Sequence, residues 1–181
     1  MPTILTHPAV PLAVGVALGT RVVPPRLLLT GVVLSILPDL DVLAFRLGIA
    51  YADTLGNRGF SHSLLFAFMA TFACATAYRP MRTRFQIALP FLLIAAVSHG
   101  VLDAFTNGGM GIAFFWPWWD ARFFAPVRPI EVSPIGFARF FSARGASVMA
   151  SEVLWVWLPL AALGLGLAAT RRIRAPARPP A

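Results

Sequence analysis

The chain has 181 residues, of which 58% are hydrophobic and only 12% are charged. A soluble domain carries about 25% charged residues, so this composition argues against a soluble globular domain and equally against intrinsic disorder. The length fits one domain, and the sequence therefore predicts an all-α, polytopic membrane protein.

Five apolar runs predict a bundle of about five helices, at about 8–20, 27–38, 63–78, 85–102 and 153–170. The last run carries no charge and is followed by RRIRAPARPPA, which is typical of a membrane span with a basic stop. The first two runs are shorter than the about 20 residues of a full span, which leaves tilted, re-entrant and buried arrangements open.

A long loop is expected between 104 and 152, before the last helix. Its segment IAFFWPWW, at 112–119, is aromatic and interrupted by Pro117, as expected of a segment at the level of lipid head groups that shapes a lipid-side entrance. Prolines at 126, 129 and 134 predict irregular backbone for the rest of the loop.

The basic residues predict an orientation, because all fifteen are arginine and arginine beside apolar runs is typical of cytoplasmic flanks. The same reasoning argues against a nucleic-acid partner for the net charge of +8. With a cytoplasmic C-terminus and five reversing spans, the cytoplasmic side holds nine arginines, and the other side holds six arginines and all seven acidic residues. We therefore expect one membrane-embedded domain at 1–170 and a basic, disordered cytoplasmic tail at 171–181.

This topology places all three histidines near the non-cytoplasmic end. In SHGVLD, His99 and Asp103 lie four positions apart on one helix face, where they can hold one metal ion or simply hydrogen-bond to each other. In LPDLD, Asp39 and Asp41 repel each other unless a cation lies between them; the alternative is a helix-end turn facing water.

Two further motifs lie at the same end. NRGFSHS puts Arg58 beside His62, with Ser61 or Ser63 able to cap the next helix; the alternative is an ordinary cap with a surface histidine. His7, near the start of the chain, would by itself be expected to be exposed. Taken together, the four motifs favour one shared metal site.

The order of His7, LPDLD, RGFSHS and SHGVLD resembles the YdjM-like, LexA-regulated inner-membrane proteins, a family described as metal-dependent hydrolases. That family is in turn similar to the all-helical zinc-dependent phospholipases C. The resemblance covers about residues 1–110 and implies a bacterial inner-membrane location. It also implies a set of metal ligands: His7, Asp39 or Asp41, His62, His99 and Asp103.

The resemblance further implies that Asp103 bridges two ions. The phospholipases carry a later helix with two histidines and a glutamate, for which only Glu152 could stand in here. That departure implies one or two ions rather than three.

These patterns predict a membrane-bound hydrolase that uses a divalent metal, Zn²⁺ foremost, on a phosphoester or lipid-linked substrate at the periplasmic face. Asp41 or Glu152 is predicted to take a proton from the attacking water. Arg58 is predicted either to hold an anionic oxygen or to pair with Asp53 or a ligand carboxylate. The alternatives are a metal or ion transporter and a non-catalytic membrane protein with a structural metal. The lipid bilayer is the expected partner, and the sequence indicates no protein partner.

Overall fold

The structure is a computed structural model, and it describes residues 1–50, 53, 56–134 and 137–174. The regular elements within these ranges are all helical. The longer helices are α1 (Ala9–Leu18), α2 (Pro25–Ile36), α3 (Leu64–Thr76), α4 (Phe85–Ala104), α6 (Ala143–Glu152) and α7 (Leu158–Arg174). The shorter elements are η1 (Leu37–Leu47), η2 (Phe60–His62), α5 (Phe137–Phe140) and a π-helical turn, η3 (Val153–Trp157), that joins α6 to α7.

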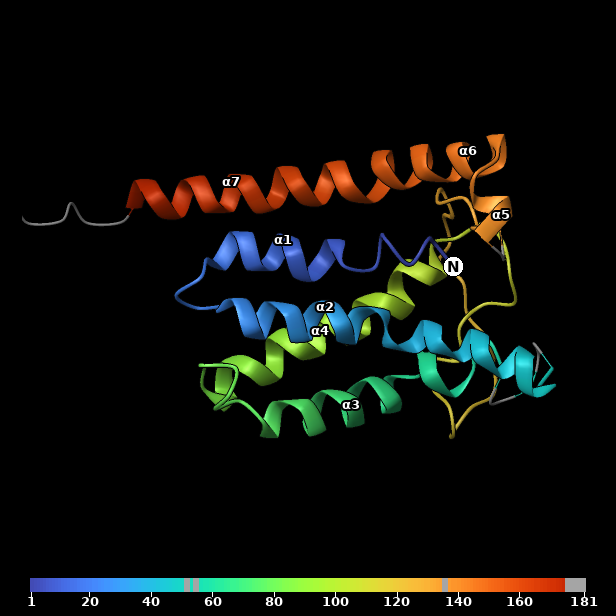
Figure 1. Cartoon of the computed structure of the whole chain (residues 1–181), viewed down its shortest axis with the longest axis horizontal. Helices are drawn as coiled ribbons and strands as arrows, with labels where there is room; N and C mark the ends of the chain where they lie inside the picture. Colours follow the sequence, from blue (N-terminus) through green and yellow to red (C-terminus); the bar gives the residue numbers. More distant parts are fainter. Residues whose placement is uncertain (51–52, 54–55, 135–136, 175–181) are drawn as a thin grey trace, which may run out of the picture.

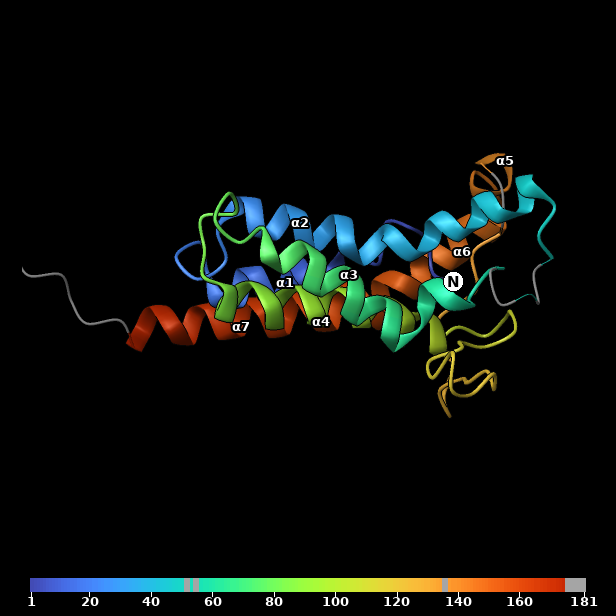
Figure 2. The same cartoon turned by 90° about the horizontal axis from the view of Figure 1, so that it is seen from below.

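The predicted five-helix bundle is confirmed. Helices α1, α2, α3, α4 and the continuous α6–α7 rod run roughly along the long axis of the molecule (Figures 1 and 2). α4 packs against both α2 and α3, while α1 packs against α7. Gly164 of α7 allows the α1–α7 contact, because a Cβ atom there would lie 2.9 Å from the Ala13 carbonyl oxygen.

Among the described residues, two helices are long and apolar enough to cross a membrane, Phe85–Ala104 and Ala143–Arg174. The second begins at Ala143 and not near Val153, so the predicted loop is too long at its C-terminal end. The sequence ARGASVMASE of α6 has too few apolar residues to resemble a span. Ser142 nevertheless starts the helix as an N-cap, where its hydroxyl accepts a hydrogen bond from Gly145 N at 3.3 Å.

Residues 105–134 of the predicted loop are irregular, as expected, and the short helix α5 follows at Phe137–Phe140. Its aromatic side chains pack on one another: Trp119 lies between Phe115 and Phe123, with ring centroids 6.2 and 5.1 Å away. Trp118 is 78% exposed, so the loop presents an aromatic side chain on the surface. At the end of the chain, α7 continues to Arg174; residues 175–181 of the predicted tail lie outside the described residues.

The two ends of the bundle differ in chemistry. The α1–α2 and α3–α4 connections and the end of α7 lie together at one end, whereas η1, the N-terminus and α5 lie at the other (Figure 1). Of the nine arginines expected on the cytoplasmic side, the eight that the structure describes lie at the first end. Between the ends, buried apolar side chains of α2, α3 and α4 form the core, including Leu27, Leu34, Phe91 and Leu92.

Candidate metal centre

Four separate segments bring the predicted ligands together at the end of the bundle opposite the arginine loops. His7 comes from the turn before α1, Asp39 and Asp41 from η1, His62 from the end of η2, and His99 and Asp103 from one face of α4. The side chains are buried: His7, His99 and Asp103 have no exposed surface, and His62 and Asp39 expose 4% and 6%.

The histidine nitrogens have defined roles. His99 Nδ1 lies 2.7 Å from the Ser35 carbonyl oxygen; because a carbonyl only accepts, Nδ1 carries the proton and Nε2 presents a lone pair. His62 Nδ1 lies 3.2 Å from Asp41 Oδ2, which fixes its proton in the same way. The two Nε2 atoms are 2.9 Å apart. Two lone pairs repel at this distance unless a proton or a metal cation lies between them.

The carboxylates surround the same point. Asp103 Oδ2 lies 3.2 Å from His62 Nε2, and Asp103 Oδ1 lies 3.7 Å from His7 Nε2. Asp39 Oδ2 lies 3.5 Å from His7 Nε2, and its Oδ1 lies 3.7 Å from His99 Nε2. The set forms two overlapping groups, His7–His99–Asp103 and Asp39–His62–His99, in which the ligand atoms lie within 4.8 Å of one another.

Several of these atoms lack hydrogen bonds among the described residues: both nitrogens of His7, both carboxylate oxygens of Asp103 and Oδ1 of Asp39. Buried polar atoms without partners are rare because each costs about 1–3 kcal/mol. Nitrogen and carboxylate oxygen are also the donors that zinc accepts. The residues present therefore fit a divalent cation.

Burial and charge act on the ligands in opposite directions. Burial lowers the pKa of His7 to about 4 and raises the pKa of Asp39 to about 7, since each group loses the hydration of its charged form. Burial also opposes protonation of His62, but the carboxylates of Asp103 and Asp41, each 3.2 Å from one of its ring nitrogens, outweigh burial and raise the pKa of His62 to about 9. Burial thus favours the uncharged forms of His7 and Asp39, whereas the neighbouring carboxylates favour the charged form of His62.

Asp39 and Asp41, which the sequence left as alternatives, occupy different positions. The oxygens of Asp41 accept hydrogen bonds from Arg58 N at 3.0 Å and from Asn57 Nδ2 at 3.2 Å, and one of them faces His62 Nδ1. Asp39 instead faces the common point with an unpaired oxygen. The geometry therefore favours Asp39 as a ligand and Asp41 as the residue that orients His62.

Arg58 is fully buried beside Asp103. Its Nη1 donates to the Gly108 carbonyl and its Nη2 to Thr106 Oγ1, both at 2.8 Å, and its Nε lies 3.5 Å from Asp103 Oδ2. Of the roles considered from the sequence, these contacts match pairing with a ligand carboxylate. They leave no exposed surface on Arg58 for holding a substrate phosphate.

Glu152 belongs to a second buried network. Its carboxylate accepts hydrogen bonds from the backbone N and the hydroxyl of Thr3 and from the hydroxyl of Thr6. Trp157 Nε1 donates to Thr6 Oγ1 at 3.1 Å. These contacts tie the segment that carries His7 to the α6–α7 rod and engage both carboxylate oxygens of Glu152, the residue predicted to transfer a proton. Sequence reasoning missed both threonines, since two isolated hydroxyls near a terminus carry no distinctive pattern.

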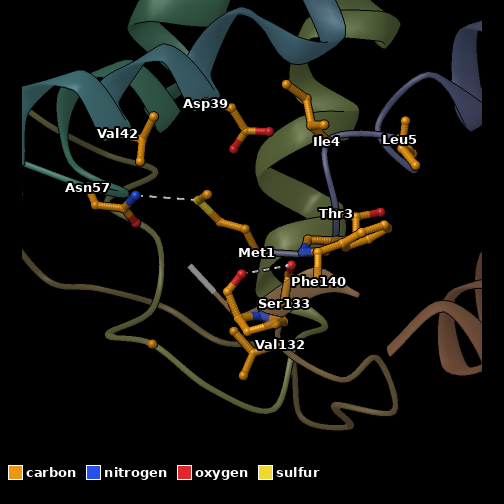
Figure 3. Close-up of a pocket in the computed structure, with 13 residues that line it drawn as sticks. Met1, Thr3, Ile4, Leu5, Asp39, Val42, Asn57, Val132, Ser133 and Phe140 are labelled. Atoms are coloured by element: carbon orange, nitrogen blue, oxygen red, sulfur yellow. Dashed lines mark hydrogen bonds between the residues drawn. The ribbon is translucent and has the colours of Figure 1, made fainter. Parts of the chain in front are cut away.

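A pocket of about 630 Å³ adjoins the cluster (Figure 3). Asp39 and Asn57 lie on its wall, and most of the other lining residues are apolar. The lining comprises Met1, Pro2, Thr3, Ile4, Leu5, Asp39, Val42, Asn57, Gly109, Val132, Ser133, Pro134 and Phe140. None of the residues 112–119 lines this pocket, so the prediction that the aromatic segment shapes the entrance is not supported.

An apolar helical bundle with a buried histidine–aspartate cluster at one end defines a membrane protein with a candidate metal centre. The chain belongs to the YdjM inner membrane protein family, whose profile matches residues 1–176. It is 47% identical to the inner membrane protein YbcI of Escherichia coli (strain K12) over 160 residues, which cover 88% of this chain and 92% of that protein. The predicted family and inner-membrane location are thus confirmed.

No solved structure matches the chain. The predicted similarity to zinc-dependent phospholipase C is therefore not shown.

Proposed function

We propose that the protein is a metal-dependent hydrolase that cleaves a phosphoester or lipid-linked substrate at the periplasmic face of the inner membrane. The observation that supports this most strongly is the convergence of unpaired, buried nitrogen and oxygen atoms beside an apolar pocket. Five residues would hold one or two ions, with Zn²⁺ favoured by the mixture of imidazoles and carboxylates: His7, Asp39, His62, His99 and Asp103.

Two residues of the site have roles beyond binding the ion in this proposal, Asp39 and Arg58. A bound zinc ion would supply a Lewis acid that activates water and polarises the scissile bond. Asp39 touches both the cluster and the pocket, so its carboxylate is placed to accept a proton from a nucleophile there. We assign proton transfer to Asp39 because the oxygens of Asp41 and Glu152 are engaged elsewhere. Arg58 holds Asp103 through charge and so positions it.

The orientation follows from the arginines. We place the arginine-rich end, with the C-terminus, in the cytoplasm and the cluster at the periplasmic side of a multi-pass bundle. A reporter fused after residue 181 should then read cytoplasmic, and one inserted near Gly109 should read periplasmic. The reverse pattern would reject the periplasmic site.

The metal proposal is tested by His99→Ala with Ser98→Ala as its matched control. Ser98 is the preceding residue of α4, is also buried, and donates only within its own helix, to the Ala95 carbonyl. Metal analysis of the purified proteins in detergent should find the ion in wild type and Ser98→Ala and none in His99→Ala. Full metal content in His99→Ala would reject the ligand role.

Catalysis is tested separately, because complete burial of His7, His99 and Asp103 also suits a structural ion, which has no open coordination position. A panel of soluble and lipid phosphoesters should be hydrolysed by the metal-loaded wild type and not by His99→Ala. If no member is hydrolysed and chelation lowers the melting temperature, the structural-metal alternative is correct.

A transporter is disfavoured because the polar cluster lies at one end of the bundle, whereas transport sites lie near the midplane.

A further inference from the structure

The pocket beside the cluster has the character of a binding site for an apolar molecule. Its volume of about 630 Å³ lies within the range of about 300–1,000 Å³ found for small-ligand sites. Asp39 connects it to the cluster, and apolar side chains from the N-terminal segment, Val132, Pro134 and Phe140 form much of its wall (Figure 3). A small hydrophilic phosphoester would leave most of this wall without contacts.

The surroundings of the pocket are also apolar. Ile4 and Leu5 line it, yet they are 52% and 54% exposed. Nearby, the rod of α6 and α7 is long and apolar, and only 17% of its most hydrophobic stretch is buried, so most of its apolar side chains lie on the surface of the bundle. An apolar rim beside such a helix suits entry from the bilayer better than entry from water.

One polar atom in the wall indicates the chemistry of the head group. Asn57 is 1% exposed, and its Nδ2 points to Asp41 Oδ1 at 3.2 Å and to Met1 Sδ at 3.5 Å. The remaining amide atom, Oδ1, is an acceptor, and no group of the described residues donates a hydrogen bond to it. A ligand at this wall would therefore be held best by a hydroxyl or ammonium group.

We propose that the pocket binds a hydrocarbon chain of an inner-membrane lipid whose head group carries a hydrogen-bond donor. The chain occupies the space between the N-terminal segment, Val132 and Phe140, and the donor faces Asn57. The head-group ester then lies against Asp39. This last step rests on the proposed hydrolase function, whereas lipid binding does not.

The experiment is photo-crosslinking in nanodiscs of Escherichia coli polar lipids that contain phosphatidylglycerol with a diazirine in its acyl chain. Wild type should be labelled within residues 1–5 or 132–134 or at Phe140. Val132→Trp fills the pocket and should lower this labelling roughly tenfold, with Ile4→Trp at the exposed rim as a second variant. Leu29→Trp, at a residue 64% exposed on α2, is the control and should be labelled like wild type.

Two comparisons separate the possible failures. Labelling of the pocket peptides that is unchanged in both Val132→Trp and Ile4→Trp, with metal content intact, overturns the lipid site. A phosphatidylcholine probe, which has no head-group donor, should label more weakly than phosphatidylglycerol; equal labelling overturns the role of Asn57. His99→Ala should keep full labelling, so loss of hydrolysis with labelling retained counts against neither the pocket nor its occupant.

Discussion

Helix α4 passes through two cores of opposite character. Its first half buries Phe91 and Leu92 among apolar residues of α2 and α3, and its second half buries His99 and Asp103 among polar ones. In lipid, close packing holds the first core together, whereas the second places charged groups where their desolvation is costly. The arginine-end half therefore supplies stability, whereas the polar half costs stability and suits the metal binding proposed for it.

The largest effect should follow from Asp103→Ala, which should lower both the metal content and the stability of the fold. It removes a proposed ligand and leaves the buried guanidinium of Arg58 without its carboxylate. Breaking a buried pair costs about 3–5 kcal/mol, so we expect loss of bound metal and a clearly lower melting temperature. The contact with Arg58 is the reason that we expect this substitution to lower the stability as well as the metal content.

Asp103→Asn is the control for the two effects, because it keeps the shape and one oxygen beside Arg58. Metal content and melting temperature in detergent should both fall less than in Asp103→Ala. If Asp103→Ala melts like wild type, the ion pair contributes nothing measurable and the comparison between the two cores fails.

Leu92→Ala should weaken the apolar core of α4 and leave the polar core intact. Leu92 is fully buried on α4, and truncating a buried leucine costs about 2–5 kcal/mol through lost contacts and the cavity left behind. We expect a lower melting temperature with an unchanged ratio of bound metal to folded protein. A parallel loss of metal would show that the two halves of α4 are not independent.

Asp41→Asn should have a smaller effect, on metal affinity alone. Asp41 orients His62 through Nδ1 and is not proposed as a ligand, and partners of this kind typically change metal affinity about 10–100-fold. Competition with a chelator should therefore rank wild type first, Asp41→Asn second and Asp39→Asn third. The reverse order of the two variants would make Asp41 the ligand.

The helices and the proximity of the ligand residues could be expected from the sequence for a simple physical reason. Apolar runs report burial in lipid or core, and a histidine four residues before an aspartate shares its helix face. Helix α6 could not be recognised from apolar runs, because its polar residues hide it and only the cap at Ser142 marks its start. The contacts of Arg58 could not be predicted from the sequence either, since its partners Thr106 and Gly108 lie some fifty residues away in the chain.

The smallest effect is expected at the end of the bundle far from the cluster, from Arg171→Ala. Arg171 of α7 donates from Nη1 to the Ala17 carbonyl at 2.6 Å and to the Val16 carbonyl at 3.5 Å. These carbonyls close the C-terminal turn of α1, where a positive charge contributes about 0.3–1 kcal/mol at an exposed site. Arg172→Ala, which removes an exposed arginine next to it, should change the melting temperature less.

Gly19→Ala should also remove the contact between Arg171 and the end of α1, because the added methyl group displaces the arginine side chain. A Cβ atom at Gly19 would lie 2.5 Å from Arg171 Nη1, and Gly19 has a φ of +77° that disfavours alanine. Neither Arg171→Ala nor Gly19→Ala should alter bound metal, because the cap joins α7 to the C-terminal end of α1, whereas His7 directly precedes the N-terminal end of α1. Loss of metal in either variant would mean that α1 transmits displacements along its length to His7, and the two halves would then form one cooperative unit.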